Sequence, residues 1–94
     1  MRKLVWTPAF VRALKPILRR NPGLGRKVQR VLESLSADPF HPALRTHKLS
    51  GDLEGSWACS VAYDLRIVFA FVPNPGTGAE EILLQAVGSH DDVY

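Results

Sequence analysis

The chain has 94 residues, of which 46% are hydrophobic and 22% are charged, a composition typical of a globular protein and unlike that of a disordered chain. This length suits one domain, so we expect residues 1–94 to form a single folded unit. No stretch reaches the roughly 18 apolar residues of a membrane span, no signal-peptide core precedes Pro8, and Cys59 is the only cysteine, which excludes an internal disulfide. We therefore expect a cytoplasmic protein without a membrane partner.

The charges are unevenly distributed along the chain. Residues 1–48 contain 11 Lys and Arg against 2 Asp and Glu, whereas residues 49–94 contain 1 Arg against 7 Asp and Glu. Such asymmetry suggests a basic surface that meets a polyanion such as a nucleic acid. A solvated helical face that only keeps the protein soluble would give the same pattern, so the charge alone leaves both interpretations open.

The first elements in the chain are a short strand and a helix. The apolar run at residues 4–6 is expected to form the strand. Thr7 and Pro8 then predict a helix start, because a threonine hydroxyl caps free backbone N–H groups and proline suits the first helical position. Pro16 lies inside the helical apolar pattern that follows, and we expect it to bend or interrupt this helix near Lys15.

A second helix is expected to open at Asn21-Pro22, which repeats the cap-then-proline pattern, and to end before Asp38-Pro39. The break between the two helices is short, so they should form a helical hairpin. Their apolar stripes predict one buried side, and their exposed faces carry the basic residues Arg12, Lys15, Arg19, Arg20, Arg26, Lys27 and Arg30.

Beyond the second helix, the hydrophobic period becomes that of β-strands. The candidate strands cover residues 45–49, 56–62, 65–72 and 80–87, and short turns separate them. Short connections favour antiparallel neighbours. We therefore predict an α+β fold in which the N-terminal strand and the two-helix hairpin pack on a mostly antiparallel, twisted sheet.

Three segments of this second half resemble the motifs of one toxin family. Residues 47–57 (HKLSGDLEGSW) are similar to its central motif, residues 64–69 (DLRIVF) to its D-x-R-I-x-(F/Y) strand, and residues 88–94 (GSHDDVY) to its G-(x)-H-D-x-V-Y tail. Together they resemble the RelE/YafQ/YoeB branch of the RelE/ParE toxins of type II toxin–antitoxin systems. The resemblance implies two helices packed on a curved sheet, cleavage of mRNA in the ribosomal decoding site, and inhibition by a cognate antitoxin that wraps around the toxin.

RNA cleavage without a metal uses the 2′-hydroxyl of the substrate as the nucleophile. The reaction needs a base for the hydroxyl proton, a cation for the charge that develops on phosphorus, and an acid for the leaving 5′-oxygen. The sequence has no dense cluster of Asp, Glu and His for a two-metal site, so we expect a metal-free enzyme without a cofactor.

Arg66 is the expected cation. It alternates out of phase with the apolar residues of its strand, so it should emerge on the opposite face of the sheet, and it is the only Arg or Lys after residue 48. A guanidinium can grip two phosphoryl oxygens and stabilise the developing charge. The alternative is a salt bridge to Asp64 or to an acidic residue of an antitoxin.

The acid–base candidates come from the resemblance. His90 resembles the tail histidine of the family, which implies a role as general acid or base, and an imidazole suits this work because it titrates near neutral pH. His47 resembles a histidine of YafQ-like members, and this resemblance implies that it also acts as a general acid or base. Tyr94 resembles the C-terminal aromatic residue that stacks or hydrogen-bonds in the active site, although a chain end can also fray.

Three further residues complete the predicted site. Lys48 and Arg45 are expected to bind the RNA backbone, and Lys48 should face away from its neighbour His47 because side chains alternate along a strand. Asp64 resembles an acid that orients a histidine, but a turn acid that caps its own backbone would explain it equally well. Ser60 stands where YafQ-like members have a second histidine, which is a departure from the family pattern.

Two other functions remain open at this stage. A ParE-like toxin shares the fold and inhibits DNA gyrase without RNA-cleaving residues, and the pair His90 and Tyr94 argues against it. A catalytically decayed module that only binds an antitoxin is the other alternative, and Ser60 leaves room for it.

Overall fold

The computed structural model describes residues 1–89 and 93. In chain order its elements are β1 (Leu4–Trp6), α1 (Pro8–Arg20), α2 (Leu24–Ala37), η1 (Pro42–Leu44), β2 (His47–Lys48), η2 (Gly51–Leu53), β3 (Trp57–Ala62), β4 (Leu65–Pro73) and β5 (Glu80–Gly88), where η1 and η2 are short 3₁₀ helices. The strands form one sheet in the order β1-β5-β4-β3-β2. All neighbours are antiparallel except β1, which runs parallel to β5.

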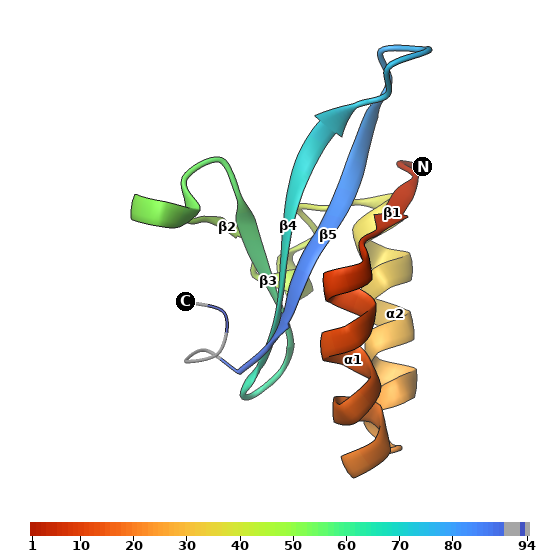
Figure 1. Ribbon diagram of the computed structural model, residues 1–94, viewed down its shortest axis with the longest axis vertical. Coiled ribbons are helices and arrows are strands. Elements are labelled where there is room, and N and C mark those ends of the chain that lie inside the picture. Colours follow the sequence, from red (N-terminus) through yellow and green to blue (C-terminus); the bar gives the residue numbers. More distant parts are fainter. Residues whose placement is uncertain (90–92, 94) are drawn as a thin grey trace.

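Both helices pack on the same side of this sheet (Figure 1). The side turned toward α1 and α2 is the helix face, and the side turned away from them is the open face. The core between helices and sheet consists of Phe10, Leu14, Val28, Leu32, Leu35, Leu44, Cys59, Leu65, Ile67, Phe69, Ile82, Leu84 and Val87. The α+β fold with a helix pair on a mostly antiparallel sheet is therefore confirmed.

Thr7 joins the start of α1 to the sheet. Its hydroxyl oxygen accepts a hydrogen bond from the backbone N–H of Phe10 at 3.1 Å and donates one to the carbonyl oxygen of Leu84 on β5 at 2.7 Å. Pro8 occupies the first turn, as the sequence predicts. One side chain thus caps the helix and sets its position against the central part of β5.

Pro16 does not interrupt α1, which is one continuous helix of 13 residues from Pro8 to Arg20. The expected break at Lys15 was therefore wrong. The N–H that proline lacks would have donated to the carbonyl of Arg12, and Arg12 is exposed, so water can solvate that carbonyl in its place. Packing of the buried residues Phe10 and Leu14 then keeps the helix together.

Two predicted boundaries were also wrong. The second helix begins at Leu24 and not at Asn21-Pro22, which form a turn in which the carbonyl of Asn21 accepts from the N–H of Leu24 at 3.0 Å. The strand expected at residues 45–49 is limited to His47–Lys48. Arg45 cannot join it, because it ends the η1 turn in a left-handed conformation with φ 53°.

No helix in the described part of the chain is long and apolar enough to cross a membrane.

Candidate active site

Arg66 lies at the start of β4, next to the turn that joins β3 to β4. It pairs with Ser60 on β3 and Gly88 on β5, and it alternates with the core residues Leu65 and Ile67, so it belongs to the open face. The strand register therefore places Arg66 on the face of the sheet opposite Leu65 and Ile67, as the sequence predicts.

The Arg66 guanidinium is held in place by backbone carbonyls of the adjoining turn. Its Nη1 donates to the carbonyl oxygens of Ala62 at 3.0 Å and Tyr63 at 3.1 Å, with a longer contact of 3.4 Å to Leu65. Its Nε and Nη2 make no hydrogen bond to a residue within 1–89. The cation is thus fixed on one side by the turn and retains donors for an anionic ligand.

A cavity of about 370 Å³ opens beside this guanidinium. Its lining includes two arginines, Arg45 and Arg66, together with Ser60 and Tyr63. Arg45 reaches it because the left-handed turn at the end of η1 redirects the chain there. Two guanidinium groups around one cavity repel each other, and an anion between them removes that repulsion. The charge and the donor set therefore suit a phosphodiester group.

His47 is an exposed residue of the short edge strand β2. Its Nδ1 lies 3.1 Å from the carbonyl oxygen of Arg45. A carbonyl can only accept, so Nδ1 carries the proton in this contact, and Nε2 is then the nitrogen with the lone pair in the neutral ring. This contact restricts the orientation of the imidazole ring.

His47 and Arg66 project from the same face of the sheet. His47 is the direct partner of Ala58, Ala58 is the partner of Val68, and Val68 follows Arg66 by two residues on β4. Two strand spacings of about 4.8 Å and one two-residue step of about 6.7 Å place the Cα atoms of His47 and Arg66 about 12 Å apart. His47 does not line the cavity beside Arg66, so the structure places the two residues on one face without bringing their side chains together.

The same sheet with the same helix pair occurs in solved toxin structures. A variant toxin from Helicobacter pylori matches with a TM-score of 0.79 and 22% identity over 100% of both chains. A chain of the E. coli DinJ–YafQ complex matches with a TM-score of 0.78 and 14% identity over 100% of this chain and 99% of that one. The YoeB/ParE toxin from Agrobacterium tumefaciens gives 0.76 and 19% over 94% and 98%, respectively. The chain has the RelE-like fold. No protein-family model and no curated protein matches its sequence.

The RelE-like sheet does not bring every predicted residue to the open face. Lys48 is the partner of Trp57 in the register, and its Nζ lies 5.5 Å from the centre of the Trp57 ring. Trp57 packs against the core on the helix face. Lys48 therefore lies on the other side of β2 from His47.

Asp64 occupies the exposed turn between β3 and β4, two residues before Arg66. This position places its carboxylate at the same end of the sheet as the Arg66 cavity. His90 and Tyr94 lie outside the described residues.

Tyr63 is a residue of the site that sequence reasoning missed. Its side chain is 98% exposed, and it lines the cavity beside Arg66. The sign in the sequence that could have identified Tyr63 is an aromatic residue in a tight turn, a position where Gly, Asn and Asp are most common. His41 accepts a hydrogen bond from the N–H of Ala43 through Nδ1 at 3.1 Å and so caps η1.

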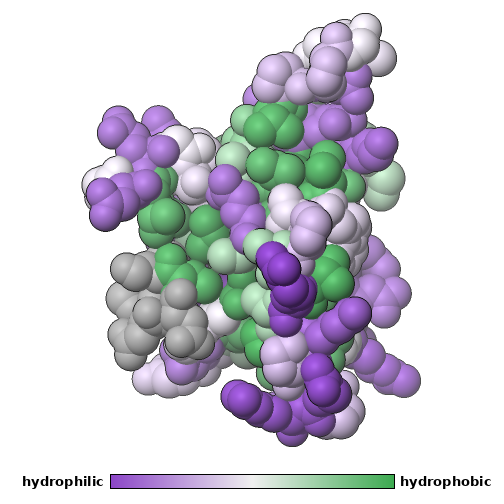
Figure 2. Space-filling view, in the orientation of Figure 1, coloured by the Kyte–Doolittle hydropathy of each residue, from purple (hydrophilic) through white to green (hydrophobic). Residues whose placement is uncertain are grey.

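A second charged region lies on the helices. The helical basic surface consists of exposed side chains on α1 and α2, namely Arg12, Lys15, Arg19, Arg20, Arg26, Lys27 and Arg30. Figure 2 shows hydrophilic side chains gathered over this helical side of the molecule. None of these seven side chains lines the Arg66 cavity, so the two charged regions are separate.

Proposed function

We propose that this chain is the toxin of a type II toxin–antitoxin system and acts as a metal-independent endoribonuclease on mRNA. The observation that carries the proposal is the pair His47 and Arg66 on one face of the sheet, with Arg66 held by carbonyls beside a cavity that Arg45 also lines. The RelE-like fold, shared with proteins whose names describe toxins, supports it.

The proposed reaction transfers the phosphoryl group within the RNA. The 2′-oxygen forms a bond to phosphorus, the bond from phosphorus to the 5′-oxygen breaks, and the product is a cyclic phosphate. One imidazole removes the 2′-hydroxyl proton and another group protonates the 5′-oxygen, and we assign this work to His47 and His90. Arg66 stabilises the charge on the phosphoryl oxygens, an effect worth about 3 kcal/mol in a preorganised site.

The other predicted residues receive supporting roles in this proposal. Tyr94 stacks on a base or hydrogen-bonds near the scissile phosphate, and Asp64 orients a histidine. Arg45 binds the backbone phosphate at the shared cavity, since it borders the same space as Arg66.

The separate helical basic surface supports the ribosome as the place of cleavage. A site on the open face can hold mRNA while the cations of α1 and α2 contact a second RNA molecule, as an enzyme bound to ribosomal RNA requires. The proposal therefore places the protein in the bacterial cytoplasm, at the decoding site.

A cognate antitoxin is the proposed protein partner. Among the E. coli YafQ structures that resemble this chain, one is that of a complex with DinJ. For this chain we propose an antitoxin segment with acidic side chains that occupies the cavity between Arg45 and Arg66 and so excludes phosphate.

The experiment that tests the function maps 5′ ends of mRNA in cells that express the wild type or Arg66→Ala. We expect new ends within translated regions for the wild type and their loss for Arg66→Ala. Lys3→Ala, which removes one exposed charge from the segment before β1, is the control and should retain cleavage. Intact mRNA with a DNA-damage response would instead indicate a gyrase inhibitor, and harmless expression of folded protein would indicate a decayed module. Either result overturns the proposal.

A further inference from the structure

A group of aromatic side chains lies outside the candidate active site, on the helix face. This aromatic platform consists of Phe40, Trp57 and Phe71. The Phe40 ring lies 5.9 Å from Phe71 in a stacked arrangement at 30° and 5.2 Å from Trp57, edge to face at 77°. Phe71 and Trp57 also pack against the core, but Phe40 is 53% exposed. Phe40 thus presents aromatic surface to solvent on top of a packed base.

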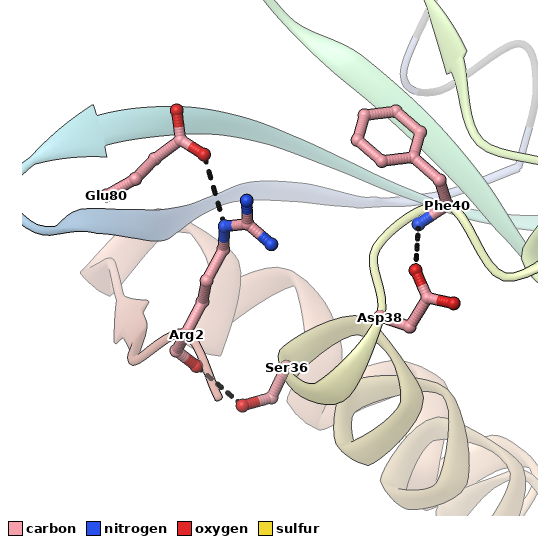
Figure 3. A network of polar contacts seen from close by, with 5 residues as sticks. All are labelled: Arg2, Ser36, Asp38, Phe40 and Glu80. Carbon is pink, nitrogen blue, oxygen red and sulfur yellow. Dashed lines mark hydrogen bonds and ion pairs between the residues drawn. The ribbon is translucent and has the colours of Figure 1, made fainter.

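Phe40 is held in this exposed position by its own loop. Its backbone N–H donates to Oδ1 of Asp38 at 3.2 Å, and the Thr46 hydroxyl donates to the carbonyl of Pro39 at 2.6 Å. Figure 3 shows the Asp38 contact, with the Phe40 ring extending away from the end of α2. Because the loop is fixed before any ligand arrives, a molecule that stacks on Phe40 gains contact without first ordering the ring.

Two cations stand at the edges of the platform. Lys48 Nζ lies 5.5 Å from the centre of Trp57, and Arg2 Cζ lies 5.5 Å from the centre of Phe71. Arg2 forms an ion pair with Glu80, which accepts from its Nε at 3.1 Å, and the Ser36 hydroxyl donates to the Arg2 carbonyl (Figure 3). Its Nη1 and Nη2 donate to no residue among those described, so they can donate to a ligand.

We propose that the aromatic platform binds one nucleobase of single-stranded RNA, stacked on Phe40, while Lys48 and Arg2 contact the phosphates on either side. Base stacking on aromatic rings combined with flanking cations is the general chemistry of single-strand binding. One open ring between two cations matches the unit of one base between two phosphates.

The place of the platform relative to the active site supports this ligand. β2 is the edge strand of the sheet, and its two residues face opposite ways, His47 to the open face and Lys48 to the platform. An RNA strand that leaves the cleavage site over this edge meets Lys48 and then Phe40. The inference rests on the proposed function in one respect, because RNA cleavage at His47 is what brings a strand to this edge.

The test measures binding of a short, fluorescein-labelled 2′-O-methyl oligoribonucleotide by fluorescence anisotropy. This probe has no 2′-hydroxyl and cannot be cleaved by the proposed route, so binding is measured apart from catalysis. Phe40→Leu removes the aromatic face and should weaken binding about tenfold. Trp6→Leu is the matched control, because Trp6 is 49% exposed on β1 and belongs to a different ring pair, and it should bind as the wild type does.

A second pair of variants separates stacking from a loss of folding. Phe40→Trp retains an aromatic face and should bind at least as tightly as the wild type. Lys48→Gln should lower the slope of log affinity against log salt by about 0.7, the value for one phosphate contact on a single strand. If Phe40→Leu binds the RNA probe as tightly as the wild type does, the inference is overturned. This holds also if Phe40→Leu loses affinity for an antitoxin, because the platform would then bind protein and not RNA. Absence of cleavage of the unmodified RNA, with the binding results intact, would refute the proposed function alone.

Discussion

Arg66 and Ala62 are joined across the β3–β4 turn by a hydrogen bond of 3.0 Å from Nη1 to the carbonyl oxygen. The same nitrogen also contacts the carbonyl of Tyr63. The turn therefore determines where the guanidinium lies, so Arg66 is a positioned cation and not a mobile surface charge.

Arg66→Lys tests whether the shape of the cation matters as well as its charge. One ammonium group cannot donate to the turn carbonyls and also grip two phosphoryl oxygens. We expect RNA cleavage to fall by about 100-fold. Single-turnover cleavage in a reconstituted translation system measures the rate, and thermal unfolding checks that the fold is retained. A rate equal to that of Arg66→Ala would also fit this mechanism, whereas a rate equal to that of the wild type would not.

His47→Gln should slow cleavage by about 100-fold, because glutamine can hydrogen-bond but cannot transfer a proton at neutral pH. The same substitution at His41 is the matched control. His41 is also exposed but caps η1, so His41→Gln should leave the rate within a factor of about two. Single-turnover cleavage rates at neutral pH provide the measurement, and only His47→Gln should lower the rate. Equal effects of both substitutions would refute the assignment.

Thr7→Ala should destabilise the fold by about 2 kcal/mol, because it removes both the cap of α1 and the bond to the carbonyl of Leu84. Thr7→Ser keeps the hydroxyl and should cost less than about 1 kcal/mol. Urea unfolding followed by circular dichroism measures both values. If the two variants were equally stable, the hydroxyl would have no part in joining helix and sheet.

Burial raises the pKa of the Cys59 thiol to about 12 from its ordinary value of 9.0, because the thiolate would lose its hydration. Between these values the folded state keeps a proton that the unfolded chain releases. The contribution of Cys59 to stability is therefore full below pH 9 and is lost as the pH rises toward 12, at up to about 1.4 kcal/mol per pH unit.

Cys59→Ala makes this effect measurable. The variant should be less stable than the wild type below pH 9 by a constant amount, because alanine leaves a small cavity. The difference in unfolding free energy should then shrink as the pH rises. A difference that stays constant across the alkaline range would show that the thiol does not titrate as described.

The parts of the fold that depend on local periodicity were predictable. The apolar stripe of α1, including Phe10 and Leu14, and the alternation of Leu65 and Ile67 about Arg66 follow directly from spacing along the chain. The continuity of α1 through Pro16 was not predictable, because it depends on whether the carbonyl of Arg12 faces water, and only the packed structure shows that.

The candidate site was predictable in its residue types more than in its arrangement. That His47 and Arg66 share a face follows from the pairs His47–Ala58 and Ala58–Val68, and register is a property of three strands together. The position of Arg45 at the cavity depends on the left-handed end of η1, which the strand-like pattern of residues 45–49 conceals. Tyr63 was missed for a related reason, because a turn residue shows its role only when the neighbouring cavity is known.

The pairing of β1 with β5 has a consequence for the synthesis of this chain. Leu4–Trp6 align with Ile82–Leu84, so β1 leaves the ribosome well before its partner strand β5 has been made. Burial of Phe10 and Leu14 of α1 also depends on β5, because β5 contributes Ile82 and Leu84 to the same core. In a nascent chain that stops before Glu80, the sheet therefore lacks β5 and α1 lacks the strand that it packs on. Arg66 also lacks its β5 partner, Gly88. The candidate site can therefore assemble only after β5 has been translated.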